Sequence, residues 1–293
     1  MIGMRRLACS VFLLLFTASL LCSADKKAWK DATLQVGDIK MHYVEAGTGE
    51  RALIFVPAWT MVAEVWREQI PYFAARGFHV FAIDPRSQGQ TTKTDGGNSY
   101  QQQAADLHAF LKTLKLEHAA LVGSGAGVLS LLEYVSSPEA LQPEKLVFIE
   151  ANPCGYKDND YPFGMTMQQA RAFALAFEED RAKATNQWVR NLFRNKQTEL
   201  LYKDLADGSM KTPLGAAAAL FLDAFTGDRR PALARIPVPT LLLMSSDYRL
   251  LGEYVQSKIN RSRLEVVEDS GSALYLDKPQ TFNQLVEAFL GEN

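Results

Sequence analysis

Cysteine and histidine are scarce in this chain, which has three cysteines and four histidines among 293 residues. Cys9 and Cys22 both lie in the N-terminal apolar stretch, so its removal would leave Cys154 alone and exclude an intramolecular disulfide. No group of histidines and cysteines has the spacing of metal ligands. The sequence therefore predicts neither a metal site nor any other cofactor.

An excess of charge of one sign is also lacking. The 31 lysines and arginines nearly balance the 33 aspartates and glutamates, which gives a net charge of −2. Proteins that bind nucleic acid or an anionic membrane surface generally carry a basic excess, so neither partner is expected. With 47% hydrophobic residues, the chain is long enough and apolar enough to bury one large core. This composition leaves the oligomeric state open.

A long apolar run occurs only at the N-terminus, where Arg5 and Arg6 precede residues 7–21 and small residues lead to Ala24. This order is typical of a secretory signal peptide, and a mainly apolar run of fifteen residues is too short to span a bilayer comfortably. We expect residues 1–24 to be cleaved after Ala24, which gives a secreted or periplasmic protein without a membrane span. An uncleaved anchor is one alternative. A lipoprotein modified at Cys22 is another, which the bulky residue before Cys22 disfavours.

Short apolar runs alternate with helical patterns along most of the chain. The first two runs are joined at Gly37-Asp38 and predict an antiparallel hairpin, whereas the later alternation indicates a mostly parallel, doubly wound sheet. The expected strands are residues 33–36, 40–45, 52–56, 79–83, 119–122, 145–149, 240–244 and 263–267. The expected helices are residues 66–75, 100–114, 126–135, 251–259 and 280–290, the last capped by Gly291.

The alternation stops between residues 155 and 230, where only helical patterns occur. These patterns cover residues 167–177, 185–193, 198–205 and 215–225. We therefore predict a core made of residues 25–154 and 231–293, interrupted after its sixth strand by a helical cap at residues 155–230.

Residues 121–128 read Leu-Val-Gly-Ser-Gly-Ala-Gly-Val and join a short apolar strand to a helix. That context is the one required by the nucleophile elbow Gly-x-Ser-x-Gly. Over about residues 33–290 the chain resembles the α/β-hydrolase superfamily, in its capped, esterase- and peroxidase-like branch. The resemblance implies the α/β-hydrolase fold with a cap over a pocket, and a catalytic triad in the order nucleophile, acid, histidine.

Two of the three triad positions are substituted. The resemblance places Gly125 at the nucleophile, and a residue without a side chain cannot attack a substrate. It places Ser272 at the histidine, and a serine cannot serve as a general base near neutral pH. Asp247 matches the acid. The four histidines do not repair the loss and are predicted to be structural or exposed: His42, His79, His108 and His118.

Other nucleophiles are disfavoured. An elbow centred on Ser124 would put Val122 and Ala126 where the tight turn needs glycine, and the Ser124 side chain is expected to point away from the pocket. Ser87 and Cys154 are predicted to be structural, because neither has an activating partner nearby in sequence. The Gly-x-Gly-x-Gly run also lacks the spacing to the third glycine that a dinucleotide-binding loop, Gly-x-Gly-x-x-Gly, requires.

The oxyanion site is predicted to be retained. The resemblance assigns it to the backbone N–H groups of Trp59 and Ala126, beside Ser124, and backbone donors do not depend on side-chain identity. The most consistent interpretation is a degenerate, non-hydrolytic protein that binds a small apolar or carbonyl ligand. One alternative is an esterase-like hydrolase that uses a non-standard serine or a non-covalent mechanism. A module that binds a partner through its cap surface is another, and it alone requires no cavity beneath the cap.

Overall fold

The computed structural model describes residues 28–292. The predicted signal peptide, residues 1–24, lies outside the described residues, as does the start of the predicted core at residues 25–27. Among the described residues no helix is long and apolar enough to cross a membrane.

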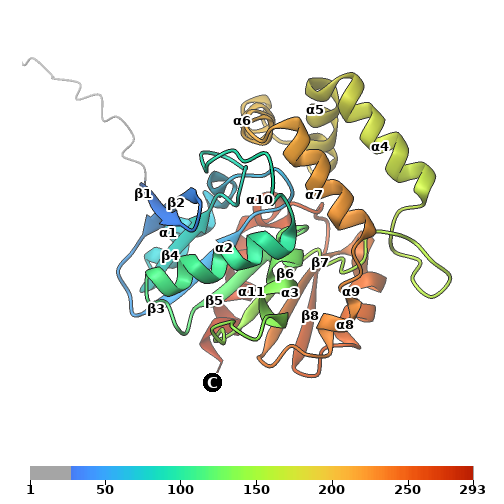
Figure 1. The fold of residues 1–293 in the computed structure, drawn as a ribbon. Coiled ribbons are helices and arrows are strands. Elements are labelled where there is room, and N and C mark those ends of the chain that lie inside the picture. The colour runs from blue at the N-terminus through green and yellow to red at the C-terminus, as the bar shows by residue number, and fades with distance from the viewer. Residues whose placement is uncertain (1–27, 293) are drawn as a thin grey trace, which may run out of the picture.

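An eight-stranded sheet forms the centre of the molecule, in the order β1-β2-β4-β3-β5-β6-β7-β8 (Figure 1). β2 is antiparallel to β1 and to β4, and all other neighbours are parallel, which confirms the mostly parallel sheet with its leading hairpin. The strands are β1 (Lys30–Val36), β2 (Ile39–Ala46), β3 (Arg51–Val56), β4 (Phe78–Ile83), β5 (Ala120–Ser124), β6 (Leu146–Ile149), β7 (Thr240–Ser245) and β8 (Ser262–Val267).

Helices cover both faces of this sheet. One buried cluster joins the sheet to α2 (Tyr100–Thr113), α3 (Gly127–Ser136), α8 (Arg230–Leu233) and α9 (Arg249–Gln256). The opposite cluster joins it to α1 (Gln69–Ala74), α10 (Leu274–Asp277) and α11 (Pro279–Gly291). Strand residues alternate between the two clusters, with Ile54 on one side and Leu53 and Phe55 on the other, because successive side chains of a strand point to opposite faces.

The helical insertion is also confirmed. After β6 the chain forms α4 (Met167–Glu179), α5 (Arg181–Asn191), α6 (Glu199–Met210) and α7 (Leu214–Thr226) before it returns to the sheet. These helices stand together beyond the carboxyl ends of the parallel strands (Figure 1, yellow to orange). In α/β sheets this edge is where ligands bind.

Two local predictions need correction, and one short helix was not predicted. The helix expected at 66–75 is a 3₁₀ turn, η1 (Ala63–Trp66), followed by α1, because Pro71 lacks the N–H that a longer helix would need there. Gly291 is the last residue of α11 rather than its cap, and the extended Glu292 ends the helix. The short helix α10 is not evident in the sequence pattern.

Candidate functional site

Gly125 forms the turn between β5 and α3. Its φ of +52° lies in the left-handed region that glycine adopts without steric cost. A side chain on Gly125 would find space, since the nearest atom to an added Cβ is the Cβ of Ala58 at 3.4 Å. The Gly125 N–H donates to the carbonyl of Ile149 at 2.8 Å, which fixes the turn against the end of β6. The turn therefore has the shape of an elbow and room for a nucleophile that the sequence does not supply.

The two flanking glycines are required for packing. A Cβ on Gly123 would lie 2.8 Å from a methyl carbon of Leu131, and one on Gly127 would lie 2.5 Å from the carbonyl oxygen of Pro57. Both distances are shorter than van der Waals contact. α3 can therefore approach the end of β3 only because residue 127 carries no side chain, whereas a side chain at residue 123 in β5 would require the Leu131 side chain to shift.

Ser124 is buried and is directed toward the core. Its hydroxyl lies against the phenol of Tyr275, whose ring packs on Trp66 with the centroids 4.3 Å apart. Burial raises the pKa of Tyr275 to about 12, and the Ser124 hydroxyl acts in the opposite direction. No histidine or carboxylate is among these contacts, so nothing in them activates Ser124.

Asp247 lies in the 3₁₀ turn η2 (Ser246–Tyr248) that follows β7. Its side chain is 67% exposed and pairs with the guanidinium of Arg194 at 2.6 Å. Ser272 contacts the Tyr248 hydroxyl of the same turn. Burial raises the pKa of Tyr248, as does the charge of Glu150, and the Ser272 hydroxyl lowers it. The structure thus brings Asp247 and Ser272 to one edge of the sheet, with an arginine as the partner of the carboxylate.

Glu150 is a site residue that the sequence reasoning missed. It is the first residue after β6, has a φ of +52°, and is only 8% exposed. Its Oε1 accepts a hydrogen bond from the Ser245 N–H at 2.6 Å, and its Oε2 has no partner among the described residues. The register that pairs Ser124 with Ile149 places Glu150 beside Gly125. The only sequence signal was a glutamate that directly follows a buried apolar strand.

The electrostatics of Glu150 follow from this position. The pKa of Glu150 is raised to about 7, mainly by burial and to a smaller extent by the charge of Asp247, against the Ser245 N–H, which lowers it. A carboxyl group with such a pKa exchanges its proton near neutral pH.

Trp59 and Ala126 carry the two predicted oxyanion donors. Trp59 lies in the loop after β3, Ala126 precedes α3, and both pack against one small cluster of Tyr100, Leu129 and Leu220. Among the described residues, neither backbone N–H has a hydrogen-bond partner. Two unpaired donors beside the elbow can bind a carbonyl oxygen. The Trp59 indole donates to the carbonyl of Ala217 in α7 at 2.9 Å and so joins this loop to the cap.

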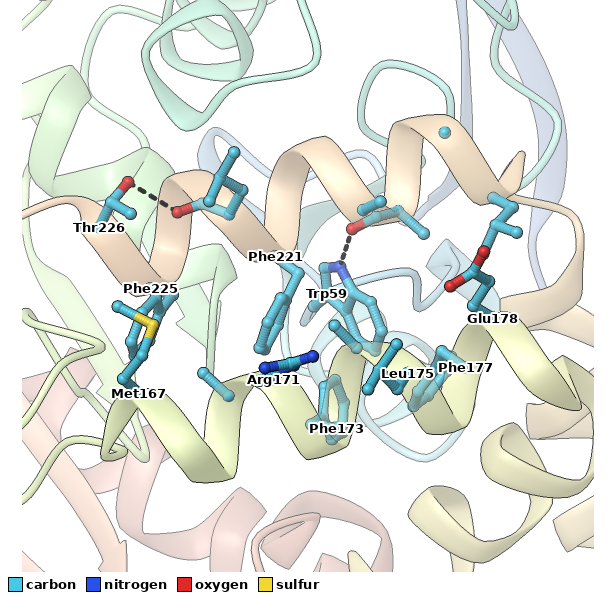
Figure 2. A pocket seen from close by; sticks show the side chains of 17 residues that line it. Trp59, Met167, Arg171, Phe173, Leu175, Phe177, Glu178, Phe221, Phe225 and Thr226 are labelled. Atoms are coloured by element: carbon cyan, nitrogen blue, oxygen red, sulfur yellow. Dashed lines mark hydrogen bonds between the residues drawn. The ribbon is translucent and has the colours of Figure 1, made fainter.

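A cavity of ≈ 620 Å³, here called the cap groove, lies between α4 and α7 (Figure 2). The Trp59 ring lies at its inner side and contacts Phe173, Phe177 and Phe221 with centroid separations of 5.6, 5.1 and 6.2 Å. No residue of the elbow lines it. Its lining is Trp59, Met167, Ala170, Arg171, Phe173, Ala174, Leu175, Phe177, Glu178, Leu214, Gly215, Ala217, Ala218, Phe221, Leu222, Phe225 and Thr226.

Comparison with known proteins decides the family. A model described as "Alpha/beta hydrolase family" matches residues 53–285. The chain belongs to the α/β-hydrolase family. It is 26% identical over 244 residues to the AB hydrolase superfamily protein YisY of Bacillus subtilis (strain 168), covering 82% of this chain and 91% of that protein. It is 24% identical over 263 residues to a putative non-heme chloroperoxidase of Synechocystis, covering 86% of this chain and 95% of that protein.

Solved structures share the fold of this α/β hydrolase. A bromoperoxidase from Bacillus anthracis has a TM-score of 0.84 at 22% identity, covering 90% of this chain and all of that one. An esterase from Exiguobacterium antarcticum has a TM-score of 0.85 at 22% identity, with the same coverage. The chain thus falls in the branch of the family that contains esterases and non-heme haloperoxidases.

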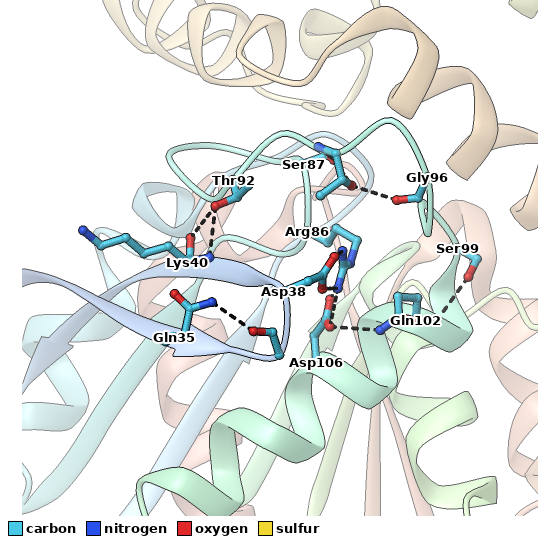
Figure 3. Close-up of polar contacts among 12 residues, drawn as sticks. Gln35, Asp38, Lys40, Arg86, Ser87, Thr92, Gly96, Ser99, Gln102 and Asp106 are labelled. Carbon is cyan, nitrogen blue, oxygen red and sulfur yellow. Dashed lines mark hydrogen bonds and ion pairs between the residues drawn. The ribbon is translucent and has the colours of Figure 1, made fainter.

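The remaining sequence candidates of this α/β hydrolase have packing roles. Ser87 is buried with a φ of 62°, and its Oγ lies 3.1 Å from the Thr94 hydroxyl. Its neighbour Arg86 is held by Asp38 and Asp106, with bonds of 2.7 and 2.8 Å (Figure 3).

Cys154 and the histidines also lack a place in the site. Burial raises the pKa of the Cys154 thiol, so the reactive thiolate is disfavoured. His42 is buried against Asp84 at 2.8 Å, and His79 pairs with Glu45 at 2.6 Å. Among the described residues no cluster of three or more His, Cys, Asp or Glu side chains could hold a metal ion.

Proposed function

We propose that this α/β-hydrolase protein is non-hydrolytic and binds a small apolar or carbonyl ligand. One observation carries the proposal: the elbow has a left-handed turn at φ +52° and space for a side chain, yet the residue there is Gly125. Without an oxygen or sulfur at this point no acyl-enzyme can form. The family acts on small molecules, which supports a ligand of that size.

The second substitution supports the same conclusion. A serine nucleophile and its histidine act as a unit, so the loss of either residue removes most of the rate enhancement. The remaining residue then has no catalytic role, and its substitution has no further effect on catalysis. Here Ser272 stands at the histidine position, and Asp247 pairs with Arg194 instead of an imidazole. The two free N–H groups at Trp59 and Ala126 are independent of these losses, so carbonyl binding can persist without turnover.

Fluorophosphonate labelling tests the proposal. The protein as purified is expected to take up no label and to hydrolyse no short-chain ester. A Gly125→Ser/Ser272→His variant is expected to be labelled at residue 125, because the turn has room for the hydroxyl. Gly125→Ser alone is the matched control and should stay unlabelled for want of a base. Stoichiometric labelling of the unsubstituted protein, located by peptide mass, would overturn the proposal.

We further propose that the protein is secreted or periplasmic, on the basis of the charged, apolar and small-residue order of residues 1–24. The intact mass of the exported protein used for labelling tests this. A mature chain that begins at Asp25 is the expected result, and a chain that keeps residues 1–24 would contradict it.

A second candidate function, hydrolysis without a covalent intermediate, has Glu150 in its favour. Its carboxylate would take a proton from water as the water oxygen attacks a carbonyl carbon, and the proton would then pass to the departing alcohol. Oε2 is closed to solvent, which weighs against this role. On this mechanism turnover would rise as pH passes about 7, where Glu150 ionises, and Glu150→Gln would abolish it. We expect no such turnover to be found in steady-state ester assays.

A further inference from the structure

We propose that the cap groove binds an elongated apolar monocarboxylate, with Arg171 pairing to its carboxylate. This inference rests on the proposed non-hydrolytic function and goes beyond it, because it assigns a ligand to the cap groove, which no residue of the elbow lines. The evidence is the shape of the groove, the apolar side chains at its rim and the single unpaired cation within it.

The shape of the groove favours a chain-like ligand. α4 and α7 have 13 residues each and flank the cavity along their length (Figure 2). Thirteen helical residues extend about 20 Å. Aromatic rings follow one another along this length, with Phe173 stacked on Phe221 at 4.8 Å and Phe221 parallel to Phe225 at 6.3 Å. Every lining residue except Arg171, Glu178 and Thr226 is apolar. Such a surface binds by burial of hydrocarbon rather than by many polar contacts.

The rim of the groove exposes apolar side chains that a free soluble protein would normally cover. Met167, Leu222, Leu175 and Leu214 are 72, 59, 42 and 41% exposed, and all four line the cavity. They are four of the nine large hydrophobic residues that are exposed in the described part of the chain. A concentration of this kind marks a binding surface.

Arg171 supplies the charge that selects the ligand. It is the only cation among the lining residues and is exposed, and no ion pair or hydrogen bond of its side chain is found within residues 28–292. Figure 2 shows its guanidinium between α4 and α7, beside Phe221 and Phe173. The planar donors of this exposed guanidinium match the two oxygens of a carboxylate whose hydrocarbon chain lies along the apolar lining.

Glu178 limits the ligand to one carboxylate. It is seven residues from Arg171 on the same helix, so both face the groove about 10 Å apart. At this distance Glu178 does not neutralise Arg171, but it repels a second anionic group at the far end of a chain. The groove is therefore expected to prefer a monocarboxylate over a dicarboxylate of equal length.

Tryptophan fluorescence titration of the exported protein tests the inference, because Trp59 lines the groove and the ring of Trp188 packs on Trp59 with the centroids 5.3 Å apart. Dodecanoate, dodecanol, dodecyltrimethylammonium and dodecanedioate are the probes, each kept below micelle formation. We expect dodecanoate to bind about threefold to fivefold more tightly than the other three. Arg171→Gln should weaken dodecanoate by about the same factor, the size of one lost ion pair at an exposed arginine, and leave dodecanol unchanged. Lys183→Gln, which removes an exposed cap charge outside the groove, should change neither affinity.

Several results would overturn the inference. One is equal affinity for dodecanoate and for the trimethylammonium probe. Another is that Arg171→Gln and Lys183→Gln weaken the binding of dodecanoate equally. A third is that the protein binds phosphatidylcholine vesicles but not free dodecanoate. The labelling experiment is independent of the titration. Stoichiometric labelling would refute the non-hydrolytic function whatever binds in the groove, whereas loss of carboxylate selectivity in an unlabelled protein would refute only the ligand class.

Discussion

A Gly127→Ala variant is expected to lose about 3 kcal/mol of unfolding free energy, at the upper end of the usual cost of overpacking. The new Cβ would lie 2.5 Å from the Pro57 carbonyl oxygen and 2.7 Å from that of Val56. Both obstacles are backbone atoms, so no side-chain rotation can relieve the clash. α3 would have to move away from the end of β3, and the loop that carries Trp59 would move with it. Urea unfolding followed by far-ultraviolet circular dichroism measures the loss.

Two other Gly→Ala changes separate steric clash from backbone conformation. Gly125→Ala places a Cβ in ordinary van der Waals contact with the Cβ of Ala58, at 3.4 Å and φ +52°, so mainly the left-handed conformation costs free energy, about 1 kcal/mol. Gly215→Ala lies in the first turn of α7 with nothing within 4 Å, and should stabilise the protein by about 0.5 kcal/mol. If Gly127→Ala proved no worse than Gly125→Ala, the close approach of α3 to β3 would be wrong.

The fold was largely predictable from the sequence because its signals are local. Buried strands such as residues 52–56 appear as short apolar runs, and the cap helices have apolar residues at helical spacing. The small residues at 123–127 mark the elbow because only glycine allows so close an approach of strand and helix. Pro71, whose effect on the expected helix at 66–75 was overlooked, shows that a periodic pattern alone does not locate a helix boundary.

The electrostatics of the site could not be predicted, because they depend on residues far apart in the chain. Arg194, which follows α5, pairs with Asp247 53 residues later, and no spacing rule connects the two. The cap groove likewise depends on how α4 and α7 are placed relative to Trp59. Glu150 is buried because Ser245, 95 residues away, lies over it at the end of β7. A polar residue at the end of an apolar strand is ordinarily expected in solvent.

Glu150 is expected to make the protein less stable as pH rises from about 4.5 to about 7. Its pKa is about 7 in the folded protein and near 4.5 in the unfolded chain, so across this interval the folded state keeps a proton that the unfolded state has released. Unfolding free energy therefore falls as pH rises, by about 3 kcal/mol in total at 1.36 kcal/mol per pKa unit, and the contribution is constant above the folded pKa. Glu150→Gln should remove this fall.

The glutamine variant keeps the geometry while it removes the titration. Its amide oxygen can accept from the Ser245 N–H as Oε1 does, and its amide N–H can donate to the Ser245 hydroxyl, which has no partner among the described residues. The measurement is the free energy of unfolding, from urea unfolding at pH 5, 6, 7 and 8. For the control variant Glu139→Gln, which changes an exposed glutamate, the plot of this free energy against pH should run parallel to that of the unsubstituted protein. Parallel curves for Glu150→Gln as well would mean that Glu150 is already ionised in the folded protein near neutral pH. If Glu150→Gln instead becomes more stable relative to the unsubstituted protein between pH 5 and 8, Glu150 is a protonated carboxyl group beside the elbow. Such a group can donate a hydrogen bond at the place where a hydrolase has its catalytic residues.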